Sequence, residues 1–207
     1  SSFIKLQNFL SSAISKQGYL FAVNSSGNLL KVDVINGRIL WSFNILQDAA
    51  AHSTDFFKSS EIVINDDEII FSAKSSIFSY NLNTGYANWK QAVSSVGAPI
   101  IDGKNIFILT ENGYFVIIDK DEGKIISSTN ILKILKKRKQ STKVTGFIMG
   151  SGKIYSVTLN GYLIVSSPVS GKVEYFKKIG DPITSAPIIN NGKLYILTKN
   201  SRIFGFN

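Results

Sequence analysis

Cysteine is absent from this 207-residue sequence, which also has only one methionine, one histidine and four prolines. Without cysteine the chain can form no disulfide, no thiolate nucleophile and no cysteine-ligated metal site, although this absence does not fix the compartment. The histidine, His52, lies in a polar stretch, where such a residue is usually only exposed, and it leaves no persuasive Ser-His-Asp order. We predict no catalytic residues and no cofactor or metal ligands.

Long apolar runs are also missing, since none approaches the roughly 20 residues that a helix needs to cross a bilayer. No charged start followed by an apolar stretch and a small-residue cleavage site is visible. The sequence has instead 44% hydrophobic and 18% charged residues, with 16 glycines. This composition argues against disorder, and its β-branched and aromatic residues favour short strands joined by tight turns.

Basic residues outnumber acidic ones by 23 to 14, which gives a formal net charge of +9. Such a balance favours acidic partners, namely nucleic acid, anionic membrane surfaces or acidic protein faces. The alternative is a protein with many surface lysines and no such partner, because most of the charge is dispersed along the chain.

An internal repeat is the strongest pattern in the sequence. Its copies read as a short apolar strand, a polar turn, an alternating strand, an X-Gly turn and a third strand, in residues 18–41, 68–89, 105–127 and 153–175. A fifth copy, residues 193–207, contains the first two of these strands. Another strand precedes most copies, within residues 59–66, 97–103, 145–152 and 185–192. Each copy therefore has four strands, here lettered A to D.

These repeats predict an all-β protein of four-stranded antiparallel β-propeller blades, with a β-sandwich as the competing architecture. The strands that should hold equivalent places in successive blades are centred on Phe21, Phe71, Phe107, Tyr155 and Tyr195. Glycines that should adopt positive φ in the X-Gly turns are Gly37, Gly85, Gly123 and Gly171. Four residues later stand Trp41, Trp89, Ser127 and Tyr175. We expect Trp41 and Trp89 to be largely buried between blades and not to line a pocket.

The pattern apolar-x-apolar-Asp/Asn-x-x-Thr/Asn-Gly-x-x-x-Trp resembles the repeat of the PQQ-like β-propeller family. It is clearest in residues 32–41 and 80–89, and Ala-Pro pairs at 98–99 and 186–187 also fit it. The third and fourth copies lack the tryptophan, and Pro168 is predicted to interrupt the third strand of the fourth copy, where aspartate would be usual. The resemblance covers nearly the whole chain, residues 1–207, which we take as a single propeller domain or a partial propeller.

Members of this family include quinoprotein dehydrogenases that hold PQQ and Ca²⁺, cofactor-free scaffolds of outer-membrane protein assembly, and sensor propellers attached to kinases. The quinoprotein type implies a vicinal cysteine pair, which this sequence lacks.

The chain looks most similar to the C-terminal blades of the assembly scaffolds. The resemblance therefore implies a non-enzymatic scaffold without cofactor, located in the periplasm at the outer membrane. Such a scaffold would bind a protein partner such as an assembly factor. It would bind neither PQQ nor nucleic acid. A lipid anchor outside this chain would hold it at the membrane. A ligand-binding sensor propeller and a quinoprotein-type fragment are the alternatives.

Two insertions, residues 47–58 and 131–143, each join strand D of one blade to strand A of the next, so both should lie on the same face. The second begins with apolar residues that can form a helical turn with one apolar side. It then concentrates basic residues, and the candidate partner-binding residues are Lys133, Lys136, Lys137, Arg138 and Lys139. We predict a docking element for an acidic protein or an anionic lipid. A nucleic-acid arm is less suitable because no aromatic residues interleave with the basic ones, and a solvated loop packed on the blade rim is the alternative.

Acidic residues give weaker signals. Asp66, Asp67 and Glu68 are consecutive and could attract a cation, but such a cluster is more often a solvated hairpin turn. Asp119 and Asp121 alternate along the chain without an EF-hand-like loop around them.

The chain ends lead to one further expectation. Residues 2–6 precede strand A of the first copy, placed at residues 9–15, as a strand D of another blade would. They could pair beside residues 203–206 and close a five-bladed ring. We favour instead an open part of an eight-bladed ring, whose uncovered blade edges would lead to self-association.

Overall fold

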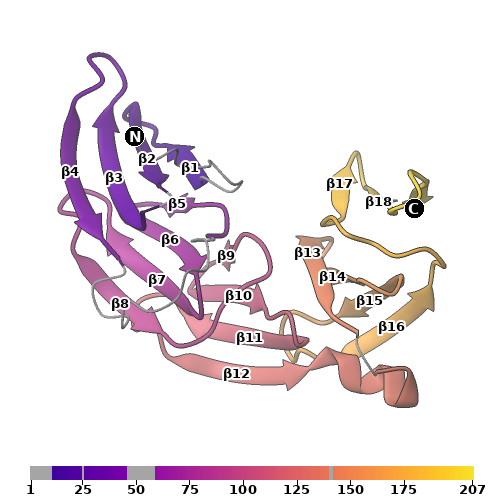
Figure 1. Ribbon diagram of the computed structural model, residues 1–207. Helices are drawn as coiled ribbons and strands as arrows, with labels where there is room; N and C mark the ends of the chain where they lie inside the picture. Colours follow the sequence, from indigo (N-terminus) through magenta and orange to yellow (C-terminus); the bar gives the residue numbers. More distant parts are fainter. Residues whose placement is uncertain (1–10, 25, 46–58, 140–141) are drawn as a thin grey trace. The chain divides into compact units, whose positions relative to one another are not determined.

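The computed structural model describes residues 11–24, 26–45, 59–139 and 142–207. They belong to two compact units, Ser1–Ser94 and Ser95–Asn207. Within these ranges the chain forms four four-stranded sheets and one three-stranded sheet, and strands that are consecutive in sequence pair side by side (Figure 1). All pairings are antiparallel, which confirms the predicted all-β fold class.

The sheets correspond to the predicted repeats and are called blades 1 to 5. Blade 1 contains β1 (Ser11–Ile14), β2 (Tyr19–Val23), β3 (Asn28–Asp33) and β4 (Ile39–Asn44). Blade 2 contains β5 (Val63–Asn65), β6 (Glu68–Ala73), β7 (Ser76–Asn81) and β8 (Ala87–Gln91). Blade 3 contains β9 (Ile100–Asp102), β10 (Asn105–Leu109), β11 (Tyr114–Asp119) and β12 (Ile125–Asn130). Blade 4 contains β13 (Val144–Gly150), β14 (Lys153–Thr158), β15 (Tyr162–Ser166) and β16 (Val173–Lys178), and blade 5 contains β17 (Ile188–Asn190), β18 (Lys193–Leu197) and β19 (Ile203–Phe206).

The five strands expected to be equivalent are each the second strand of their sheet. They are β2, β6, β10, β14 and β18, and they contain the five aromatic residues on which the prediction was centred. The order of strands in the blades is therefore confirmed. Residues 2–6 and the whole insertion at 47–58, with its His52, lie outside the described residues.

A repeated polar turn joins strands C and D. In blades 1 to 3 the side-chain Oδ1 of Asp33, Asn81 and Asp119 accepts the backbone N–H two residues later, at 2.9 to 3.0 Å. The backbone carbonyl of the same residues accepts the N–H of the turn glycine, at 2.8 Å each time. The glycines have φ of 70°, 74° and 70°, a region that side-chain-bearing residues enter at a cost.

The predicted interruption of the fourth copy by Pro168 is wrong. Strand β15 ends at Ser166, so Pro168 lies within the C–D turn. Ser167 takes the aspartate position: its carbonyl accepts the N–H of Gly171 at 2.9 Å and its hydroxyl accepts the N–H of Ser170 at 3.4 Å. Proline fits this second turn position because its fixed φ suits a turn and its missing N–H is not needed by a neighbouring strand.

Each C–D pairing also contains one extra residue on strand D. The register shifts between Lys31 and Val32, and the corresponding shifts recur in blades 2, 3 and 4. The unpaired residues are Leu40, Asn88, Ile126 and Glu174. Such a β-bulge bends the strand and increases its twist. Period-2 alternation alone therefore assigns the first residues of strand D to the wrong face of the sheet. It assigns the residues after the bulge to the correct face.

Apolar side chains fill the space between blades within each unit. In the first unit Phe21, Val23 and Leu29 of blade 1 pack with Ile69 and Phe71 of blade 2. In the second unit the largest cluster joins blades 3 and 4, and a smaller one joins blades 4 and 5. These side chains come from both neighbouring sheets, and their burial holds one blade against the next. A single blade has no closed core of its own.

Candidate functional site at the loop end of the blades

Every blade has two ends that differ in what they carry. The A–B and C–D turns lie at one end, which we call the turn end. The B–C turns and the D–A connections lie at the other, which we call the loop end, because successive antiparallel strands reverse direction. The insertion at residues 131–143 is a D–A connection and therefore belongs to the loop end of blades 3 and 4.

The B–C turns at the loop end share one polar device. A side-chain oxygen of Asn24, Thr110, Thr158 or Thr198 accepts the backbone N–H four residues later, at 2.9 to 3.3 Å. Blade 2 differs, because Ala73 pairs directly with Ser76 and leaves a two-residue turn of Lys74 and Ser75. The loop end is thus built from four similar rigid turns and one short exceptional turn.

Strand D is tied to the same turns. The first residue after strand D donates its N–H to the carbonyl of the glycine in the B–C turn. In blades 1 and 3 these bonds run from Ile45 to Gly27 and from Ile131 to Gly113, both at 2.9 Å. In blade 4 the N–H of Ile179 donates to the carbonyl of Gly161 at 2.8 Å. In these three blades the D–A connection therefore starts from a fixed point at the loop end.

The basic insertion starts as a 3₁₀ helix, η1 (Ile131–Lys139), which agrees with the expected helical turn. Asn130 Oδ1 accepts the N–H of Leu132 at 3.0 Å, as a helix cap does. Leu132 covers Gly113 so closely that a Cβ on this glycine would come within 3.0 Å of it. Leu132 and Leu135 are both 2% exposed, whereas Ile134 is 39% exposed. The apolar side of η1 is thus anchored on blade 3.

The end of the insertion is fastened to blades 3 and 4. The N–H of Val144 donates to the carbonyl of Glu111 at 2.9 Å, and Lys143 Nζ lies 2.9 Å from Glu111 Oε1. On the blade 4 side, Asn160 Nδ2 donates to Thr142 Oγ1 at 2.6 Å, and the N–H of Leu159 donates to the carbonyl of Lys143 at 2.8 Å. The insertion is therefore held by turns of both neighbouring blades.

The structure gives partial positions for the candidate partner-binding residues. Lys133 is exposed on η1. The backbones of Lys136, Lys137, Arg138 and Lys139 continue the helix, and their side chains lie outside the described residues. Together with Lys143, these residues give the segment 133–143 six basic residues and no acidic one.

Two glycines of the C–D turns also leave room for side chains of the preceding blade, which the sequence pattern does not show. A Cβ on Gly85 would lie within 3.0 Å of Phe43 and Trp41, which reach it from strand D of the preceding blade. A Cβ on Gly171 would meet Thr129 at 3.0 Å in the same way. Phe43 and Thr129 stand two residues after the tryptophan position, on the same face of the strand. Sequence reasoning missed this second covering position, although period-2 alternation points to it.

The two tryptophans are half-buried rather than fully enclosed. Trp41 packs against Phe21 and Phe43, and its Nε1 donates to the carbonyl of Asn83 in blade 2 at 3.2 Å. An indole at this position therefore contributes a hydrogen bond to the next blade as well as apolar contact.

Lys31 was not singled out in the sequence, yet it is only 7% exposed between blades 1 and 2. Its Nζ donates to the carbonyl of Leu82 at 3.3 Å and lies 4.4 Å from the ring centroid of Tyr19. Burial lowers the pKa of the Lys31 ammonium from its usual value. Its position in an alternating strand, between Leu29 and Asp33, gave no sign that the side chain faces another blade.

Replacing Lys31 with methionine should leave the free energy of unfolding near neutral pH unchanged or raise it by about 1 kcal/mol, because an apolar chain of similar length avoids the cost of burying a charge. Because the pKa is lowered in the folded state, the folded protein binds fewer protons than the unfolded chain just below pH 10.5, and this group makes stability rise with pH there. Urea unfolding of wild type and Lys31→Met between pH 7 and pH 10 should show a smaller rise in the variant. A large loss of stability at pH 7 would instead mean that the ammonium stabilises the interface.

Acidic residues do not gather into a site. Asp66 has a φ of 50° in the A–B turn of blade 2, and the carbonyl of Asp67 accepts the N–H of Leu82 at 2.7 Å. Asp119 is the acceptor of a C–D turn. Among the described residues, no three His, Asp or Glu side chains lie close enough together to hold a metal ion.

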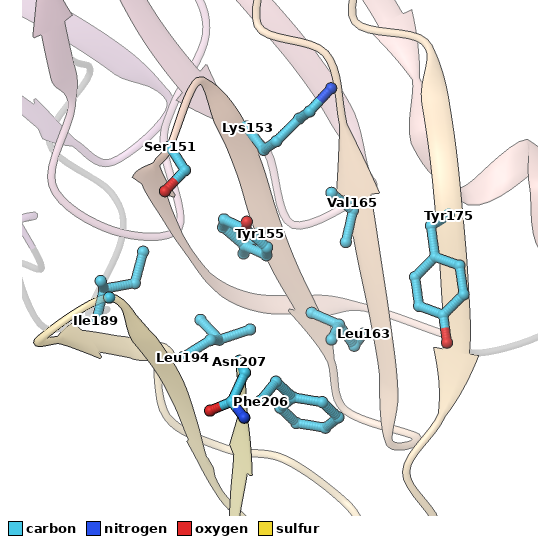
Figure 2. A pocket seen from close by; sticks show the side chains of 11 residues that line it. Ser151, Lys153, Tyr155, Leu163, Val165, Tyr175, Ile189, Leu194, Phe206 and Asn207 are labelled. Carbon is cyan, nitrogen blue, oxygen red and sulfur yellow. The ribbon is translucent and has the colours of Figure 1, made fainter.

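The second unit contains a groove of about 360 Å³ between blades 4 and 5 (Figure 2). Tyr155, Leu163 and Tyr175 line it from blade 4, and Leu194 and Phe206 line it from blade 5. The charged side chain at its rim, Lys153, is paired with Glu174 at 2.5 Å. An apolar lining of this kind provides packing area but no acid and base that converge on one point.

Comparison with known proteins agrees with this architecture. A family model described as outer membrane protein assembly factor BamB matches residues 5–129, more than half of the chain. The chain belongs to this BamB family. Its resemblance to PQQ-like propellers, noted from the repeat, is thereby confirmed.

Relatives within the BamB family are distant in sequence. The outer membrane protein assembly factors BamB of Yersinia pestis and Escherichia coli are 20% and 22% identical over 185 and 186 residues, 87% and 86% of this chain. The chain spans 45% of the length of each of these relatives. It therefore corresponds to about half of such a protein.

Solved structures show the same fold. BamB from Moraxella catarrhalis superposes with a TM-score of 0.71 and 16% identity, over 97% of this chain and 62% of the other. The β-propeller domain of Myceliophteria thermophila Cps50 (Swd1) gives a TM-score of 0.70 with 11% identity, over 95% of this chain and 63% of the other. Both likenesses establish the β-propeller fold. No helix in the described ranges has the length and apolar character required to span a membrane.

Proposed function

We propose that this protein is a non-enzymatic scaffold in outer-membrane protein assembly and that the basic segment around η1 docks an acidic surface of a protein partner. Membership of the BamB family and the distant BamB relatives support the scaffold role. In that role the protein works in the periplasm at the outer membrane, with a lipid anchor outside this chain as a further part of the proposal.

The observation that carries the docking surface is the anchoring of η1. Leu132 and Leu135 are buried on blade 3, and residues 142–144 are bonded to blades 3 and 4. A segment anchored at both ends loses less conformational entropy than a free one when a partner binds, and the five basic residues within 133–139 favour encounter with an acidic surface. Rigid blades that present a charged connection are a usual arrangement for binding, as function tends to reside on loops of a stable scaffold.

The test is a removal of charge in the full-length protein in its native organism. Replacing Lys133, Lys136, Lys137, Arg138 and Lys139 by glutamine removes five charges and keeps the buried leucines. We expect outer-membrane β-barrel proteins to fall to the level of a strain that lacks the gene. Co-purification of the assembly partner should fall by about tenfold and should be sensitive to salt in the wild type.

A matched control removes the same charge at the turn end. Its five substitutions to glutamine are at Lys16, Arg38, Lys104, Lys172 and Lys193, which are all exposed. This variant should behave as the wild type in both measurements. Equal behaviour of the two variants would refute the η1 docking surface, and normal outer-membrane protein levels in the strain lacking the gene would refute the assembly role itself.

Self-association through uncovered blade edges belongs to the same proposal. Strand β19 is the last strand of a three-stranded sheet in the described residues, and Ile203 on it is 72% exposed. Unpaired strand edges and exposed apolar residues attract other chains. Light scattering of the purified chain across a concentration series should show growth beyond the monomer, whereas a constant monomer mass would remove this part of the proposal.

A further inference from the structure

A second, smaller pocket of about 70 Å³ lies at the loop end of the first unit. Ile45 from blade 1 and Phe78 from blade 2 give it apolar walls. Lys74, Ser75 and Ser76 line it from the short B–C turn of blade 2, and Lys90 lines it from β8. It is thus a small pocket lined by apolar residues, two serines and two lysines.

The turn that supplies Lys74 departs from the other B–C turns. Blades 1, 3 and 4 use Gly27, Gly113 and Gly161 at positive φ in these turns. In blade 5 Ser201 has a φ of 58°, and in blade 2 Lys74 has a φ of 51°, although both residue types enter this region at a cost that glycine avoids. Lys74 therefore projects from a tight two-residue hairpin turn that lies beside the pocket.

Among the described residues, the two lysines of this pocket lack the carboxylate partners that some other lysines of the protein have. Lys143 and Lys153 are paired with Glu111 and Glu174. Lys74 and Lys90 are exposed, and within the described part of the chain neither lies against a carboxylate. Lys90 Nζ instead lies 5.6 Å from the ring centroid of Phe78. Two like charges on one small pocket repel each other, and a bound anion converts this repulsion into attraction.

We propose that this pocket receives the carboxylate of a glutamate or aspartate side chain from a protein partner. Its volume suits one such group, the serine hydroxyls can donate to the carboxylate oxygens, and Ile45 and Phe78 can contact the adjoining methylene groups. The inference deepens the proposed scaffold function, because it names a second acidic contact in addition to the one at η1. A partner with separate acidic segments is therefore expected.

The test uses a fluorescein-labelled synthetic peptide with four glutamates spaced by serine, and its glutamine-matched counterpart. Fluorescence anisotropy at low salt measures binding to the full chain and to the double variant Lys74→Asn, Lys90→Gln. Asparagine tolerates positive φ, so this substitution removes the charge and keeps the turn. We expect the double variant to lose about tenfold in affinity for the glutamate peptide, with little binding of the glutamine peptide to either protein.

Two controls define the outcome. Lys16→Gln removes one exposed charge at the turn end of the same unit and should change the affinity less than twofold; Lys90→Gln alone gives a single-charge comparison within the pocket. Equal affinity of wild type, double variant and Lys16→Gln would overturn the proposal. So would binding confined to vesicles containing anionic lipid, since that would make a membrane the ligand. The titration needs no assembly machinery, so its failure is distinct from a failure of the measurements on outer-membrane proteins.

Discussion

Gly85→Ala is expected to lower the free energy of unfolding by about 2–5 kcal/mol. The new Cβ would lie within 3.0 Å of Phe43 and Trp41, two large side chains packed between blades 1 and 2. Overpacking of this kind costs about 1–3 kcal/mol, and an alanine at a φ of 74° adds about 1–2 kcal/mol. Urea unfolding followed by tryptophan fluorescence measures the loss.

Gly37→Ala is the matched control for this prediction. Gly37 holds the same place in blade 1 with a φ of 70°, but a Cβ there would meet nothing within 4 Å. Its substitution should cost only the backbone term of about 1–2 kcal/mol. The difference between the two variants isolates the contact between blades, and equal losses would mean that strand D of blade 1 does not press on the turn of blade 2.

Gly146→Ala should destabilise the second unit by about 2–3 kcal/mol, although this strand glycine has no positive φ. A Cβ on it would come within 3.0 Å of backbone atoms of Ala186, which cannot move without displacing the segment that leads into blade 5. Thermal unfolding measures the loss of stability. Limited proteolysis should also release β17 to β19 sooner than in the wild type, because blade 5 would pack less closely on blade 4.

Gly150→Ala provides the comparison within the same strand. Its Cβ would first meet the terminal Cδ1 of Ile189, which can rotate away. We expect a change below about 1 kcal/mol and no faster release of blade 5. If Gly150→Ala were as damaging as Gly146→Ala, the cost would come from filling the strand and not from the backbone of the neighbouring blade.

The candidate site was only partly accessible from the sequence. The basic residues after Leu135 and the helical start of the insertion were readable, because charge and apolar spacing are local properties of the chain. The packing of Leu132 on Gly113 depends on a turn about twenty residues earlier, which the folded blade brings alongside. The pocket of Lys74 and Lys90 was missed, because Lys74 lies in the B–C turn and Lys90 on β8, and they come together only when the sheet forms.

The sequence by itself determined the all-β repeat, the order of strands in each blade and the turn glycines, since alternation and turn chemistry are set by neighbours along the chain. It misplaced Pro168, because one residue of register decides whether proline interrupts a strand or fits a turn. Tertiary structure alone decided which glycines must also lack a Cβ, as Gly85 does under Trp41 while Gly37 does not. It also decided that Lys31 is buried against Leu82 and Tyr19. These features arise where one blade packs on the next, and contacts between separate sheets leave no period in the sequence.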